Sequence, residues 1–330
     1  MTDLADAIAA AGEGFSGVVR VTRDGELVHE SAAGFADRAH AIEMTTDTRL
    51  AIASGAKTFT ALTVLALVER GALELATPAR ALLGGDVPTL DDAVTVEHLL
   101  AHRSGFGDYL DEEALDDVRD YVLSVPTHRL AIPDDYLVLM DGLEMRTAPG
   151  AEFVYNNSGY VLLAVLAERA GGAPYHDLVD ELVCRPAGLT ATGFPYSDEP
   201  TGDLAVGYLD ADGLRTNVLH MPRRGVGDGG VATTVADIDR LWEALLAGRI
   251  VGPELVTRMT TAQGYEDDGD GYGWGCSVID DGATIGMGGY DPGISFASRR
   301  TPSTGTSWTV IANHTDGAWP VVRAIRAALA

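Results

Sequence analysis

The sequence predicts an α/β fold of the α+β kind, in which helices from both chain ends flank one antiparallel β-sheet and a mainly helical region is inserted. Two observations support this prediction. Apolar and polar residues alternate as in strands near both ends of the 330-residue chain, at residues 17–23, 26–33, 272–279, 294–298 and 308–313. Between these ends, apolar residues mostly recur at helical spacing, interrupted by prolines.

The individual elements follow from local signals. Residues 1–15 resemble a short amphipathic helix, and Asp24-Gly25 is a hairpin turn signal between the first two strands. The stretch that begins with Ser54-Gly55-Ala56-Lys57 continues at helical spacing until Gly71, which is typical of a helix end. Further helices are predicted over residues 96–102, 160–170, 175–183, 237–247 and 320–329.

These elements suggest two regions. We expect residues 1–70 and 225–330 to form the α/β sheet domain and residues 71–224 to form a mainly helical domain. The cleft between them would be the natural place for an active site.

The composition excludes several function classes. With a net charge of −26, nucleic acid and anionic membrane surfaces are poor partners. The N-terminus lacks the basic region of a secretory signal, so we expect a cytoplasmic protein. Cys184 and Cys276 are far apart, and the histidines lack metal-ligand spacing, so we expect neither metal nor cofactor. The glycine-rich residues 227–230 lack the lysine of a phosphate-binding loop.

Lys57 is the only lysine of the chain, since the other 22 of the 23 basic residues are arginines. Chance and codon bias could explain this on their own. However, arginine cannot lose its proton, whereas a buried lysine can. The position of Lys57 makes the chemical explanation more attractive, because a cation in the first turn of a helix faces the positive end of the helix dipole.

Ser54 and Lys57 together predict a nucleophile with its base. A serine at the start of a helix is usually only an N-cap. A separation of three residues along a helix nevertheless brings both side chains onto the same face of that helix. Burial and the helix dipole favour a neutral amine there, which can accept the proton of Ser54.

A second group of candidate residues follows Pro149-Gly150. Tyr155 could simply pack a loop against the core, but a phenol beside a cationic amine can be held partly ionised and act as a base and proton donor. Asn157 could bind the substrate carbonyl or amide and orient Lys57.

These motifs resemble the serine β-lactamase and penicillin-binding-protein-like hydrolases, specifically the class C β-lactamase and family VIII esterase branch. The resemblance runs over nearly the whole chain. It is carried by S-x-x-K at 54–57, LLAHRSGFGDY at 99–109, PGAEFVYNNSGY at 149–160, GDGGVATTVADIDRLWEALL at 227–246 and IGMGGYDPGISF at 285–296. It implies a β-lactamase/transpeptidase-like fold, Ser54 as the acylated nucleophile, Lys57 and Tyr155 as general base and acid, and Asn157 as a pocket residue.

The third motif of the family usually begins with lysine or histidine and lies on a strand beside the pocket. The matching residues here are Met287, Gly288 and Gly289, so the cation is missing. The resemblance implies that the backbone N–H groups of Ser54 and Tyr290 form the oxyanion hole. It also implies a mainly structural role for His102.

We therefore predict a serine hydrolase that cleaves small carboxylic esters or amides, with a neutral acyl compound favoured by the missing cation. Acyl transfer to another acceptor remains open. The alternatives are a β-lactamase, a D-alanyl-D-alanine carboxypeptidase or a D-aminopeptidase. A non-catalytic binding relative is the alternative from another class, although it would have no use for the lone lysine. The oligomeric state is left open.

Overall fold

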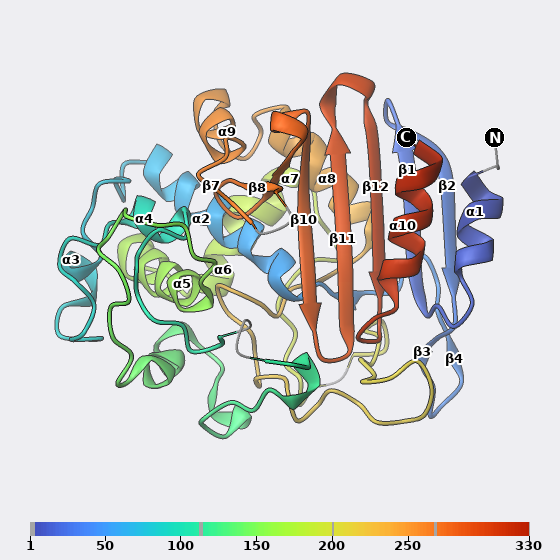
Figure 1. Ribbon diagram of the computed structural model, residues 1–330, viewed down its shortest axis with the longest axis horizontal. Coiled ribbons are helices and arrows are strands. Elements are labelled where there is room, and N and C mark those ends of the chain that lie inside the picture. The colour runs from blue at the N-terminus through green and yellow to red at the C-terminus, as the bar shows by residue number, and fades with distance from the viewer. Residues whose placement is uncertain (1–3, 112–114, 200, 267–268, 330) are drawn as a thin grey trace.

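The computed structural model describes residues 4–111, 115–199, 201–266 and 269–329. An antiparallel sheet of eight strands forms one side of the molecule, in the order β2-β1-β12-β11-β10-β9-β8-β7. Helices α1 to α10 lie around and beside it (Figure 1). The fold predicted from the sequence, one antiparallel sheet with terminal helices and an inserted helical region, is confirmed.

The strands of the large sheet are β1 (Gly17–Arg23), β2 (Glu26–Ala33), β7 (Gly264–Tyr265), β8 (Gly271–Tyr272), β9 (Ser277–Ile279), β10 (Thr284–Asp291), β11 (Ile294–Thr301) and β12 (Thr306–Ala312). Two small sheets pair β3 (Phe35–Asp37) with β4 (Ile42–Glu43) and β5 (Leu50–Ala51) with β6 (Ala232–Thr233). The helices are α1 (Leu4–Ala11), α2 (Ala56–Glu69), α3 (Ala79–Leu83), α4 (Val96–Leu100), α5 (Asn157–Gly171), α6 (Tyr175–Val179), α7 (Arg185–Ala187), α8 (Val235–Leu246), α9 (Pro253–Met259) and α10 (Ala318–Leu329).

Several predicted boundaries differ from the structure for local reasons. The predicted strand 272–279 is divided into β8 and β9, because Gly275 has φ +71° and Gly273 packs directly against the Met259 carbonyl. Strand β10 was not recognised from alternation, since its centre is the glycine-rich run Gly286-Met287-Gly288-Gly289. The predicted helix over residues 96–102 ends earlier, because His102 has φ +53°. Residues 1–3 of the predicted first helix lie outside the described residues.

The sheet has an apolar core on each face. Alternate residues of the central strands point in opposite directions, as the strand period requires. Val19, Ala297 and Val310 pack with α1 and α10 on one face. Val18, Phe296 and Ile311 belong to the larger core on the other face, which includes α8 and α2.

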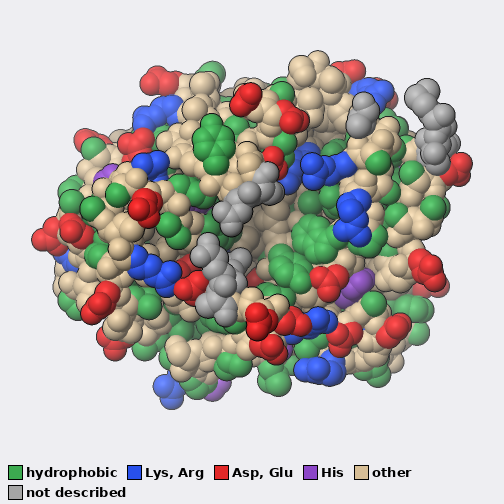
Figure 2. All heavy atoms as spheres, viewed as in Figure 1, with side chains coloured by type: hydrophobic (Ala, Val, Ile, Leu, Met, Phe, Trp, Pro, Cys, Tyr) green, Lys and Arg blue, Asp and Glu red, His purple; other side chains and the backbone are tan. Residues whose placement is uncertain are grey.

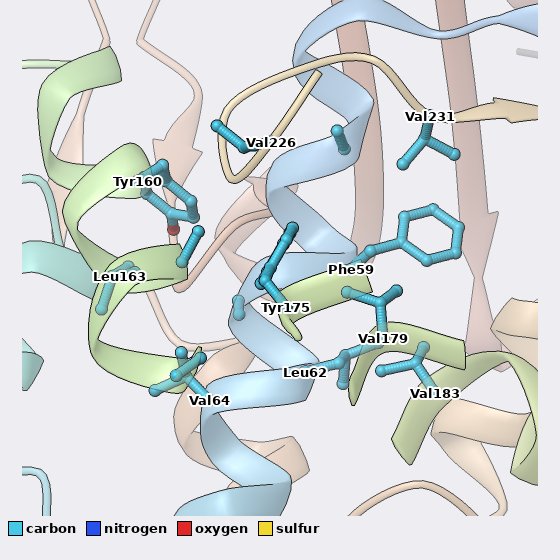
Figure 3. Close-up of a cluster of buried hydrophobic side chains, with 14 of the residues drawn as sticks. Phe59, Leu62, Val64, Tyr160, Leu163, Tyr175, Val179, Val183, Val226 and Val231 are labelled. Atoms are coloured by element: carbon cyan, nitrogen blue, oxygen red, sulfur yellow. The ribbon is translucent and has the colours of Figure 1, made fainter. Parts of the chain in front are cut away.

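Helix α2 lies at the centre of the larger core. Phe59 and Leu62 of α2 lie near Tyr175, Val179 and Val231 (Figure 3). Every residue of α2 from Ala56 to Leu67 is buried, whichever side of the helix it occupies. An α-helix that is buried on every side is surrounded by other elements, so its N-terminus is held in a fixed position.

Among the residues described, no helix is long and apolar enough to cross a membrane. Cys184 and Cys276 are both buried and unpaired with each other. How the chain divides into the two predicted domains stays a prediction.

A pair of glycine variants in β10 tests how closely this strand packs. A Cβ atom at Gly289 would lie 2.0 Å from the Ile52 carbonyl oxygen, whereas the nearest atom to a Cβ at Gly288 is 4.0 Å away. We expect Gly289→Ala to lower the free energy of unfolding by about 1–3 kcal/mol. The control Gly288→Ala should change it by about 0.5 kcal/mol or less. Urea unfolding measures both, and equal stability of the two variants would contradict the packing described.

Candidate active site

Ser54 lies in a single 3-10 turn, η1 (Ala53–Gly55), between β5 and α2. The pairing of β5 with β6 and a hydrogen bond from the Ile52 N–H to the Val231 carbonyl hold the preceding residues. Ala53 adopts φ +46°, a strained conformation for a residue with a side chain. Ser54 is therefore not the N-cap of α2, which is Gly55.

Lys57, in the first turn of α2, is fully buried beneath Ser54. Its Nζ lies 2.8 Å from Ser54 Oγ, 2.7 Å from Asn157 Oδ1 and 3.2 Å from the carbonyl oxygen of Asp228. The three contacting residues lie in the turn η1 that precedes α2, at the start of α5 and in the loop before β6. The structure thus brings the predicted nucleophile, the predicted base and Asn157 into direct contact.

The side chain of Asn157 has only one orientation that satisfies its neighbours. Its Nδ2 donates to Asp108 Oδ2 and to the Leu110 carbonyl, both at 3.2 Å. Oδ1 must then face Lys57. The N-cap of α5 is Asn156, whose side chain accepts the Gly159 N–H at 2.6 Å.

Asp108 is the residue that fixes this arrangement, and the sequence analysis did not single it out. Its carboxylate accepts the N–H groups of Asn157 at 2.8 Å and Ser158 at 2.9 Å, as well as the Ser158 hydroxyl. Burial raises the pKa of Asp108, and these hydrogen bonds partly oppose the shift. A carboxylate is favourable at the start of a helix. Asp108 could have been found from the sequence, because it is the acidic residue of the segment LLAHRSGFGDY that carries the family resemblance.

Tyr155 lies beside the Lys57 amine. The centre of its ring is 4.8 Å from Lys57 Nζ, and the ring stacks on His102 at a centroid distance of 4.5 Å. His102 is buried, and its Nδ1 accepts the Asn156 N–H at 2.9 Å. Burial holds the pKa of His102 well below its usual range, and the nearby charge of Lys57 acts in the same direction. His102 is thus a neutral, hydrogen-bonded loop residue that supports Tyr155.

Strand β10 passes close to the nucleophile. Gly289 lies against Ile52 and Ala53, where a larger residue would not fit. Met287 is buried, while Gly288 is exposed to the cleft. The Tyr290 side chain points away toward α10, where its hydroxyl donates to Asp316 at 2.9 Å and its ring contacts Trp319.

A cleft of about 560 Å³ opens above these residues, and the face in Figure 2 is hollowed near its middle. Its lining includes most of the predicted site residues, namely Ser54, Tyr155, Asn157, Met287, Gly288, Gly289 and Tyr290. It also includes Arg299 of β11, whose Nη1 donates to the Met287 carbonyl at 3.0 Å. A cation therefore lies in the cleft wall, although not at position 287.

Asp228 is a second carboxylate close to Lys57. The Tyr109 hydroxyl donates to its Oδ2, and its backbone carbonyl accepts from Lys57. Burial raises the pKa of Asp228 to about 6, and the charge of Lys57 limits the increase. From the sequence, residues 227–230 were noted as glycine-rich and as the start of a segment that resembles the family, but Asp228 was given no role.

The comparisons with known proteins agree with this fold and site. The β-lactamase family model matches residues 4–330, so the chain belongs to the β-lactamase family. Esterase EstB of Burkholderia gladioli is 33% identical over 313 residues, covering 82% of this chain and 76% of that protein. The penicillin-binding protein of Bacillus halodurans has a TM-score of 0.91 and 33% identity, covering 98% of this chain and 99% of the other.

A further relative, the putative penicillin-binding protein PbpX of Bacillus subtilis, is 26% identical over 261 residues. The match covers 78% of this chain and 62% of PbpX, so the chain spans less than two thirds of that protein. Family membership confirms the predicted enzyme class, the serine hydrolases related to β-lactamases.

An Asp108→Asn variant tests whether Asp108 positions Asn157. Asparagine offers one acceptor oxygen in place of two and adds competing donors, so Asn157 should lose its fixed orientation. We expect kcat/KM for 4-nitrophenyl butyrate to fall by roughly 10-fold or more, the scale of one charge-assisted hydrogen bond.

A double-mutant cycle separates positioning from general damage. In an Asn157→Ala background, Asp108→Asn should cause little further loss of kcat/KM. Full additivity of the two losses would contradict the positioning role. Asp111→Asn is the control, because Asp111 is in the same segment but pairs with Arg146.

Proposed function

We propose that this protein hydrolyses small carboxylic esters or amides through an acyl-enzyme on Ser54, with Lys57 and Tyr155 sharing the general base and acid roles. The observation that carries the proposal is the 2.8 Å contact between Lys57 Nζ and Ser54 Oγ in a buried position. EstB, a relative at 33% identity, is named as an esterase, which supports the ester as substrate.

The hydrogen bonds of Lys57 suit a base. In a neutral amine, two N–H groups would donate to Asn157 Oδ1 and to the Asp228 carbonyl. The lone pair would then face Ser54 Oγ and accept its proton as the oxygen attacks the substrate carbonyl. Asn157 and Asp228 thus orient the amine toward the nucleophile.

In the later steps, the proton taken from Ser54 is passed to the leaving group. As the tetrahedral intermediate collapses, the leaving alkoxide or amine takes a proton from Lys57 or Tyr155. A water molecule then attacks the acyl-enzyme, and the same groups remove its proton. The ring of Tyr155 lies over the amine, which supports a shared role for the two residues.

The oxyanion of the intermediate would be bound by the backbone N–H groups of Ser54 and Tyr290. The close approach of Gly289 to Ile52 and Ala53 supports this proposal, because it draws β10 to the turn that carries Ser54. Arg299 places a guanidinium in the cleft, and this positive charge can attract an anionic substrate. The proposal therefore does not exclude anionic substrates, although no cation is found at position 287.

Covalent labelling tests the nucleophile directly. We expect a fluorophosphonate to add one adduct to the protein, seen by intact mass, and peptide mapping to locate it on Ser54. The Ser54→Ala variant should neither react nor hydrolyse 4-nitrophenyl butyrate. A correctly folded wild-type protein that forms no adduct would instead favour a non-catalytic binding protein.

A Lys57→Arg variant tests the base. Arginine stays protonated at neutral pH and cannot accept the Ser54 proton, so kcat should fall by roughly 10³-fold. The change also requires space in a fully buried position, so the thermal midpoint must be measured alongside. Turnover near the wild-type value in a folded variant would exclude Lys57 as the base.

A further inference from the structure

A pocket of about 370 Å³ lies apart from the catalytic cleft, and nothing in the mechanism above uses it. Among the described residues, none that lines this pocket also lines the main cleft. Its walls come from β5 and β6, from residues 195–197, 201–207 and 216–222, and from the adjoining ends of β11 and β12. The larger apolar residues of the wall include Leu204, Val206, Val218, Met221 and Ile294. We refer to this space as the apolar pocket.

The walls of the apolar pocket carry no ionised side chain. Among the described residues that line it, none is Asp, Glu, Lys, Arg or His. In the whole chain, by contrast, 22% of the residues are charged. Burying a charge without a partner in such a space costs far more free energy than burying an apolar group. The walls therefore favour a ligand that is uncharged and mainly apolar.

Hydrogen bonds between the surrounding segments hold the pocket open. Asn313 Nδ2 donates to the Val206 carbonyl at 2.8 Å and to the Phe35 carbonyl at 3.0 Å. Asn217 Nδ2 donates to the Pro292 carbonyl at 2.9 Å. Because both asparagines lie in the pocket wall, these bonds fix segments on several sides of it and oppose its collapse.

The size of the pocket is that of a ligand site. Voids larger than a water molecule are rare in protein interiors, and ligand pockets usually begin at about 300 Å³. An apolar cavity of about 150 Å³ is sufficient to bind benzene. The apolar pocket is more than twice as large, so it has room for two fused rings. Val218 in its wall is 54% exposed, so the pocket meets the surface of the protein at this residue.

The apolar pocket also adjoins the backbone that supports the nucleophile. Ala51 and Ala232, which pair between β5 and β6, both line it. Ser54 follows three residues after Ala51 in the chain. A molecule in this pocket would therefore pack against the strand that leads to Ser54 without entering the main cleft.

We propose that the apolar pocket is a second ligand site, which binds an uncharged, mainly apolar small molecule of about the size of two fused rings. The site is separate from the catalytic cleft and does not depend on acylation of Ser54. Binding is driven by removal of apolar surface from water on both the ligand and the pocket walls.

Two isosteric ligands test the preference for an uncharged molecule. 2-Naphthalenemethanol carries –CH₂OH where 2-naphthylmethylamine carries –CH₂NH₃⁺ at pH 7.5. The net charge of −26 attracts cations to this protein in general, so a preference for the alcohol would come from the pocket walls. We expect the alcohol to bind at least tenfold more tightly in NMR titrations.

Methyl NMR locates the bound alcohol. Among the residues of the described pockets, Ile294 lines only the apolar pocket and Met287 lines only the main cleft. In protein labelled at isoleucine and methionine methyl groups, the Ile294 signal should shift in a saturable way, while the Met287 signal should stay in place. Shifts confined to Met287 would place the alcohol in the cleft and overturn the proposal.

A pair of aspartate variants tests the entrance. Val218→Asp places a carboxylate in the pocket wall, which should weaken binding of the alcohol at least fivefold. Leu219→Asp is the matched control, because Leu219 is 83% exposed and does not line the described pockets. We expect this control to bind within twofold of the wild type.

The remaining outcomes also decide the proposal. Equal binding of the alcohol and the amine, or equal binding by the two aspartate variants, would overturn it. None of these measurements requires catalysis. A protein that forms no acyl-enzyme on Ser54 would therefore refute the proposed function while leaving the test of the apolar pocket unaffected.

Discussion

The buried amine of Lys57 is the group on which the rest of this site depends. Removing an amine from water is costly unless its hydrogen bonds are replaced. Here the replacements come from Ser54, Asn157 and the Asp228 carbonyl, which belong to three separate parts of the chain. The position of this one nitrogen therefore requires α2, α5 and the loop before β6 to meet at one point.

Glycines make this meeting sterically feasible. A Cβ atom at Gly227 would lie 1.9 Å from the Tyr160 carbonyl oxygen of α5, and one at Gly275 would lie 2.6 Å from the Lys57 carbonyl oxygen. Gly289 allows β10 to reach the turn that carries Ser54 in the same way. Because these three glycines lack a Cβ atom, the segments that carry them can pack closely around Ser54 and Lys57.

The two carboxylates near Lys57, those of Asp108 and Asp228, have different surroundings. Asp108 is enclosed by N–H groups and a hydroxyl at the start of α5, so its hydrogen-bonding capacity is used within the protein. Asp228 instead lines a small pocket with aromatic walls. One carboxylate therefore fixes the position of a neighbouring side chain, whereas the other accepts the Tyr109 hydroxyl in the wall of this pocket.

The sequence alone determined much about this protein. The alternation near both chain ends and the helical spacing between them predicted the sheet and the inserted helices, because such periodicities report which side of an element is buried. The lone lysine three residues after Ser54 predicted the Ser54–Lys57 contact, since the turn η1 that carries Ser54 leads directly into α2 and the two residues are close in sequence. Asn157 was proposed from its position two residues after Tyr155, and the resemblance to a known family also implied a pocket residue there.

Only the tertiary structure could identify Asp108, Asp228 and Arg299 as neighbours of the site. Each is far in sequence from Ser54 and Lys57. Asp108 and Asp228 lie in segments that resemble the family, but the resemblance assigned neither carboxylate a role. The glycine-rich centre of β10 likewise lacks the alternating side chains by which a strand is recognised. Contacts between residues that are far apart in sequence depend on tertiary packing, and the local periodicity of a sequence does not reveal them.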